Sequence, residues 1–123
     1  MFQGIGALAV YVTDKERAKE FYTSVLGFEV VADLGPNLCF LKSNNGEIDI
    51  YLEGGMKPVT ADSQTSRMGF FLRAEKSAAA TFAALRKAGV RLLQEEPKAV
   101  DDNTACFQLL DPDGNIVDVC GPR

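Results

Sequence analysis

The 123-residue sequence has no histidine, no tryptophan and only three cysteines. Without histidine, the chain cannot build a Ser-His-Asp or Cys-His catalytic group or a histidine-ligated metal centre. Basic residues are also scarce, with 13 against 17 acidic residues and a formal net charge of −4. A module that binds nucleic acid usually has a basic surplus to meet the phosphates, so we expect no nucleic-acid partner.

Long hydrophobic runs are absent as well, because no apolar stretch approaches the roughly 18–20 residues that a membrane-spanning helix needs. The first seven residues have no basic start and lead directly into a strand-like run. We therefore expect neither a signal peptide nor a membrane partner.

The cysteines, Cys39, Cys106 and Cys120, are widely spaced in apolar segments, without a CxxC motif and without a basic group directly beside them. These features favour small buried hydrophobic residues over reactive thiols or metal ligands. We therefore expect a reducing, cytoplasmic location.

What is present is the composition of an ordinary globular domain, 46% hydrophobic and 24% charged. Period-2 and period-3.6 patterns alternate along the chain. They predict strands at residues 7–12, 28–32, 38–42, 47–53, 68–72, 90–94, 104–110 and 116–120. Two helices are predicted between them, the first capped by Asp14 and ended by Gly27, the second spanning 77–88 and ended by Gly89.

The order βαβββ therefore occurs twice. The helix-ending glycines recur in both halves, as do a phenylalanine in the third strand and an aspartate in the fourth (Gly27 and Gly89, Phe40 and Phe107, Asp49 and Asp118). A polar stretch without periodicity, residues 55–66, joins the halves. We interpret the chain as a single α+β domain, 1–123, made of two duplicated modules at about 4–54 and 67–121.

Alternation within the strands assigns two faces to each sheet. The apolar residues, such as Ile48, Ile50 and Leu52, are expected to face the helices. The opposite face would then carry Ala7, Ala9, Tyr11, Asp49, Tyr51 and Glu53 in the first half, and Arg67, Phe71, Arg73 and Asp118 in the second.

Two segments also resemble a known family. The run Val10-Tyr11-Val12-Thr13-Asp14, with Phe21-Tyr22 and Val25-Leu26-Gly27-Phe28, resembles the opening of the vicinal oxygen chelate superfamily, and Asp111-Pro112-Asp113-Gly114-Asn115 followed by Asp118 resembles its close. This superfamily contains glyoxalases, extradiol dioxygenases, fosfomycin-resistance transferases and bleomycin-resistance binding proteins. The resemblance implies βαβββ modules whose sheets curl around a cavity, and a homodimer, which is common among members.

The resemblance also bears on metal binding. Enzymes of the superfamily hold a divalent ion with His, Glu or Gln from the first and fourth strands of the modules. Carried over to this sequence, those positions fall at Ala7, Asp49, Arg67 and Asp118. An alanine has no ligand atom, and an arginine puts a fixed positive charge where the ion would lie. We therefore predict no cofactor, with a divalent metal ion at an atypical site as the alternative.

Together these features predict a small-molecule binding protein that holds a small organic ligand in the cavity between its modules. The alternative is a metal-dependent lyase, isomerase or dioxygenase; no catalytic residue is assigned. The candidate ligand-binding residues are Tyr11, Asp49, Tyr51, Arg67, Phe71 and Asp118. Two interpretations stay open: Arg67 and the two aspartates could instead form a structural ion-pair network, and Phe40 and Phe107 could line the cavity or belong to the core.

Overall fold

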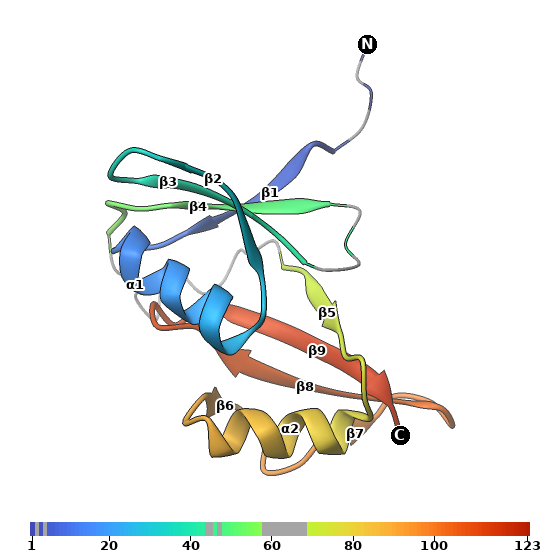
Figure 1. Ribbon diagram of the computed structural model, residues 1–123. Helices are drawn as coiled ribbons and strands as arrows, with labels where there is room; N and C mark the ends of the chain where they lie inside the picture. The colour runs from blue at the N-terminus through green and yellow to red at the C-terminus, as the bar shows by residue number, and fades with distance from the viewer. Residues whose placement is uncertain (2, 4, 44–45, 47, 58–68) are drawn as a thin grey trace. The chain divides into compact units, whose positions relative to one another are not determined.

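The computed structural model describes residues 1, 3, 5–43, 46, 48–57 and 69–123, and the chain divides into two compact units, Met1–Pro58 and Val59–Arg123 (Figure 1). The division falls inside the polar stretch 55–66 that the sequence suggests as a linker. That the two units form one domain stays a prediction.

The first unit has the predicted order of elements. It consists of β1 (Ala7–Tyr11), α1 (Lys15–Glu20), a π-helical turn η1 (Phe21–Val25), β2 (Glu29–Leu34), β3 (Leu38–Lys42) and β4 (Asp49–Glu53). Its sheet has the order β1-β4-β3-β2, in which β1 runs parallel to β4 and the other neighbours are antiparallel. The first and last strands of the unit therefore lie side by side.

Local signals explain where the first helix begins and ends. The Asp14 side chain accepts a hydrogen bond of 3.2 Å from the backbone N–H of Arg17, which caps the helix. After the helix and its π-helical turn, Gly27 adopts a φ of +81°, a left-handed conformation that favours glycine. Ala18 and Tyr22 are fully buried, so this side of the helical segment packs inward.

The second unit repeats this connectivity. It consists of β5 (Phe71–Arg73), α2 (Ala78–Lys87), β6 (Arg91–Leu92), β7 (Lys98–Ala99), β8 (Thr104–Leu110) and β9 (Ile116–Pro122). The sheet order is β5-β9-β8-β6, with β5 parallel to β9 and the short β7, which the sequence analysis did not predict, pairing with β8. Ser77 caps α2 and Gly89 follows it with a φ of +81°. The α+β fold and the repeated βαβββ order are confirmed.

The proposed correspondence of Phe40 with Phe107 is wrong. Phe107 is 2% exposed and packs edge-to-face on Phe82 of α2, with 5.1 Å between the ring centroids, so it belongs to the core. Phe40 lies on the face of its sheet that points away from the helix, where its ring is beside that of Tyr51. Because side chains alternate along a strand, an offset of one residue between the two halves reverses the face that a phenylalanine occupies.

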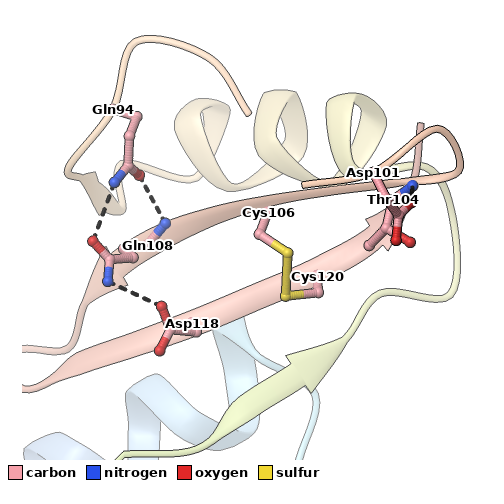
Figure 2. Close-up of a disulfide and its surroundings, with 7 residues drawn as sticks. All are labelled: Gln94, Asp101, Thr104, Cys106, Gln108, Asp118 and Cys120. Carbon is pink, nitrogen blue, oxygen red and sulfur yellow. Dashed lines mark hydrogen bonds between the residues drawn. A yellow bond between two sulfur atoms is a disulfide. The ribbon is translucent and has the colours of Figure 1, made fainter. Parts of the chain in front are cut away.

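The interpretation of the cysteines is wrong for two of the three. Cys106 of β8 and Cys120 of β9 are direct cross-strand partners, with Cα atoms 4.2 Å apart, and form a disulfide (Figure 2). Both are half-buried, since alternation puts them on the face away from Phe107. Cys39 is fully buried as predicted, and burial raises the pKa of its thiol.

A cluster of ionic groups joins α1 to the β2 strand. Lys15, of which 4% is exposed, contacts the Asp33 carboxylate and donates a 2.6 Å hydrogen bond to the Gly35 carbonyl. Lys19 contacts the other Asp33 oxygen at 2.8 Å. The hydrogen bond with Asp33 raises the pKa of Lys15 and raises that of Lys19 to about 12, while hydrogen bonds from the two lysines, Lys15 first, lower the pKa of Asp33.

This cluster predicts acid sensitivity. A carboxyl group whose pKa is lower in the folded state contributes stability that is complete above its unfolded pKa, about 4, and is lost as the pH falls through the folded value. We expect Asp33→Asn to lower the melting temperature at neutral pH, and the difference from the native chain to shrink toward about pH 2. Thermal unfolding followed by circular dichroism across this pH range measures it. The exposed substitution Asp102→Asn is the control; a constant difference at every pH would contradict the prediction.

None of the helices in the described part of the chain combines the length and the apolarity that crossing a membrane requires.

Candidate functional site

The face of the first sheet that points away from α1 carries most of the predicted residues of this half. In the parallel pairing of β1 with β4, Ala7 lies opposite Asp49, Ala9 opposite Tyr51, and Tyr11 opposite Glu53. Between them, Ile50 and Leu52 are 4% and 0% exposed on the helix side. The alternation of faces is therefore confirmed for β4, whereas Ile48, predicted to be buried, precedes the strand and is 45% exposed.

An aromatic pair occupies the middle of this face. The rings of Phe40 and Tyr51, from neighbouring strands, have centroids 5.2 Å apart and planes inclined by 31°. The small side chain of Ala9 lies on the other side of Tyr51. Asp49 is two residues before Tyr51 on the same face, half-buried, and takes part in no hydrogen bond or ion pair among the described residues. This face therefore combines an apolar ring surface with a carboxylate that no described residue pairs with.

On the corresponding face of the second sheet lies another carboxylate, that of Asp118, which the side-chain amide of Gln108 holds (Figure 2). Asp118 lies between Phe71 of β5 and Gln108 of β8 in the strand register. Gln108 Nε2 donates a 3.0 Å hydrogen bond to Asp118 Oδ1, and Gln94 Nε2 donates one of 3.1 Å to Gln108 Oε1. The Gln108 backbone N–H donates at 2.8 Å to Gln94 Oε1, which completes the link. Asp118 is thus fixed through one oxygen, and its Oδ2 accepts no hydrogen bond from the described residues.

The two remaining predicted residues are Phe71 and Arg67. Phe71 is 57% exposed and lies directly opposite Asp118, as Ala7 lies opposite Asp49 in the first unit. By register, the second half's counterpart of Ala7 is therefore Phe71. Arg67, which the sequence analysis set at that position, lies outside the described residues, so its ion-pair network with the aspartates stays a prediction.

In both units the first strand pairs in parallel with the last strand, and this repeated arrangement can be compared with known families. A sequence model of the Glyoxalase/Bleomycin resistance protein/Dioxygenase superfamily matches residues 4–119. The chain belongs to this superfamily. The resemblance noted from the opening and closing motifs is thereby confirmed.

One relative is similar in sequence, and two solved structures share the fold. The chain is 31% identical to YetH of Bacillus subtilis (strain 168), an uncharacterized protein, over 94% of this chain and 96% of YetH. TnmS3, an antibiotic binding protein from Streptomyces sp. CB03234, is similar in structure, with a TM-score of 0.78 and 24% identity over 99% of this chain and 98% of TnmS3. Lactoylglutathione lyase from Agrobacterium tumefaciens gives a TM-score of 0.72 and 22% identity over 98% and 94%.

The superfamily raises the question of whether the described residues fit a metal ion. Each unit's register pair has one carboxylate, Asp49 or Asp118, facing a side chain without a donor atom, Ala7 or Phe71. Among the described residues, no three His, Cys, Asp or Glu side chains gather in a group that could hold an ion. Two isolated carboxylates do not make the ligand set that a transition metal prefers.

Sequence reasoning missed Gln94 and Gln108. Gln108 stands in an apolar strand, at the position that alternates with the buried Phe107 and Leu109, and that pattern was enough to assign it to the face of Asp118. Gln94 was harder to find, because it follows the short β6 and reaches Gln108 across the sheet.

Proposed function

We propose that this superfamily member binds a small organic molecule on the sheet face that carries Asp49, and that the equivalent face of the second unit, which carries Asp118, offers the same chemistry. The observation that carries the proposal is the group on the first sheet, where the Tyr51 and Phe40 rings lie beside Asp49 and no described residue pairs with that carboxylate. A flat, apolar molecule can lie against the rings, and a donor or positive charge on it can reach the carboxylate.

The second sheet supports the same ligand chemistry. Phe71 supplies an exposed ring directly opposite Asp118, and Asp118 keeps one oxygen for a donor because Gln108 holds the other. The net charge of −4 favours the approach of a cation. Similarity in fold to TnmS3, described as an antibiotic binding protein, also supports a binding function.

The alternative function is a metal-dependent lyase, isomerase or dioxygenase activity, since lactoylglutathione lyase has a similar fold. We favour binding, because the side chains opposite Asp49 and Asp118 offer no ligand atom. We accordingly propose no metal cofactor.

The binding proposal predicts the effect of removing the Tyr51 ring. We expect proflavine, a flat aromatic cation, to bind the native chain, and Tyr51→Leu to weaken binding about fivefold through loss of stacking. Tyr51→Phe, which keeps the ring, should bind as the native chain does. Fluorescence titration of the three proteins measures this, and equal affinities for the leucine and phenylalanine variants would contradict a stacking role.

Melting temperatures of the same proteins, measured with added metal ions, test the enzymatic alternative. A tightly bound ion raises the melting temperature, because it binds the folded state alone. We expect no such rise with Zn²⁺, Ni²⁺, Mn²⁺ or Fe²⁺. A large metal-dependent rise would overturn the metal-free proposal and favour the enzymatic one.

A cytoplasmic location and a homodimer remain proposals. We propose a homodimer because homodimers are common in the superfamily. Light scattering on the purified chain tests this, and a monomer mass would refute it.

A further inference from the structure

The Cys106–Cys120 pair lies in the row of residues next to Asp118. Cys106 is two residues before Gln108 on β8, and Cys120 is two residues after Asp118 on β9. Because side chains two apart share a face of a strand, the disulfide and the Gln108–Asp118 hydrogen bond are neighbours on one surface (Figure 2).

Two basic residues on the neighbouring strands lie in the same cross-strand row as the disulfide. Arg73 of β5 is the register partner of Cys120, and Lys98 of β7 is the register partner of Cys106. The sequence showed no basic group beside either cysteine, so the pairing of strands creates this environment. Lys98 Nζ also contacts Glu96 Oε1 at 4.0 Å. Half-burial leaves both cysteines within reach of small molecules.

Contacts other than the disulfide also hold the strands together. β8 and β9 are joined by seven register pairs, from Thr104 with Pro122 to Leu110 with Ile116, and β5 and β6 flank them. Their turn is held separately by hydrogen bonds to Asp111. Reduction of the disulfide therefore leaves the two thiols opposite each other, ready to re-form the bond.

From these observations we propose that Cys106 and Cys120 are a reversible thiol–disulfide site that controls ligand binding at Asp118. The proposal rests on the proposed binding function. Its substrates are small thiols and their disulfides, such as reduced and oxidised glutathione.

The exchange balances in two steps. A small-molecule thiolate attacks one sulfur of the pair, breaks the Cys106–Cys120 bond and forms a mixed disulfide with that cysteine; the other cysteine leaves as a thiolate and takes up a proton. A second small thiol then attacks the mixed disulfide, which releases the remaining cysteine as a thiol and the small molecule as its disulfide. The cysteine pair gains two electrons and two protons, and the two small thiols lose them.

The oxidised form binds the ligand more tightly. The disulfide ties β8 to β9 one row from Asp118, which restricts the motion of the strand that carries the carboxylate before the ligand arrives. In the reduced form two separate thiols occupy this row and can rotate, so part of the binding free energy is spent on ordering the surface. We expect proflavine affinity to fall about tenfold on reduction.

The test uses the full chain equilibrated in glutathione buffers of increasing reducing strength. Thiols counted after denaturation should rise from one, Cys39, to three as the pair is reduced, and return to one with oxidised glutathione. Circular dichroism at each point should stay that of the folded chain. A chain that unfolds on reduction, or a pair that does not re-form, would overturn the proposal.

Proflavine titration of the same samples completes the test. Affinity that falls about tenfold on reduction and returns on oxidation supports the proposal, whereas equal affinity in both forms overturns it and leaves the binding function standing. If neither the oxidised nor the reduced chain binds proflavine, the proposed binding function is wrong, and so is its control by the disulfide.

Two variants guard against indirect effects. A chain with both Cys106→Ser and Cys120→Ser should bind proflavine with the affinity of the reduced form, and glutathione should not change that affinity. Cys39→Ala, which removes the buried thiol of the other unit, should keep the full response. A response that follows Cys39 would overturn the assignment to the pair.

Discussion

Replacing Asp111 with alanine should lower the free energy of unfolding by about 2–4 kcal/mol, with a fall of about 10 °C in melting temperature. Asp111 is 1% exposed at the turn between β8 and β9. Its Oδ1 accepts hydrogen bonds from the backbone N–H groups of Asp113 and Asn115 at 2.9 and 2.8 Å, and its Oδ2 accepts one from Asn115 Nδ2 at 2.9 Å. Alanine would remove the carboxylate that accepts these three hydrogen bonds and leave a small void.

Urea unfolding of the two proteins measures this difference. Asp111→Asn should lose less, because its amide oxygen can still accept from the turn. Asp102→Ala, which removes an exposed carboxylate of the same unit, should stay within about 0.5 kcal/mol of the native chain. If Asp111→Ala were as stable as this control, the turn would not depend on the buried carboxylate.

Replacing Asp118 with asparagine should weaken proflavine binding about 10- to 100-fold, the range for losing a hydrogen bond or contact to a charged partner. The substitution keeps the size of the side chain, and the asparagine oxygen can still accept from Gln108 Nε2. The fold should therefore persist, while the charge that meets the cation is lost.

Asp102→Asn is the matched control, because it removes the same unit of charge from an exposed position outside the sheet face. It should change proflavine affinity less than about twofold, through long-range attraction alone. If the two variants lost affinity equally, net charge would account for the binding, and Asp118 would have no place in the site.

Much of the fold could be predicted because the local signals are independent of tertiary context. Asp14 was predicted as a helix cap, and glycine after each helix was predicted as its end; Gly27 and Gly89 both adopt positive φ. Ser77, predicted as the first residue of the second helix, is its cap. The parity of Asp49, Tyr51 and Asp118 followed from strand alternation in the same way.

What failed depended on pairing between strands. Nothing local shows that Phe40 and Phe107 stand one residue out of step, because the offset appears only when Gln108 is set opposite Asp118. For the same reason, the counterpart of Ala7 was assigned to Arg67, whereas the register gives Phe71. Register between distant strands is a property of the packed sheet, and a single sequence leaves it open by a residue or more.

The cysteines failed for a further reason. Their apolar neighbours suggested burial, yet alternation alone would have set Cys106 with Gln108 and away from Phe107. Their partnership needed the β8–β9 register, in which Cys106 meets Cys120 fourteen residues away. Apolar neighbours in the sequence thus indicate a strand, but the environment of one side chain depends on which face of the sheet it occupies.

The parallel pairing of β1 with β4, and of β5 with β9, sets the order in which each unit can form. β2, β3 and β4 pair with neighbours along the chain, whereas Ala7 has no partner until Asp49 has been synthesised. Closing so long a loop costs more entropy than forming a hairpin, so the outer strand is expected to dock after the hairpins. The surface that carries Asp49 and Tyr51 is then expected to be completed by the slowest contact of its unit, so that a nascent chain would complete the proposed binding face last.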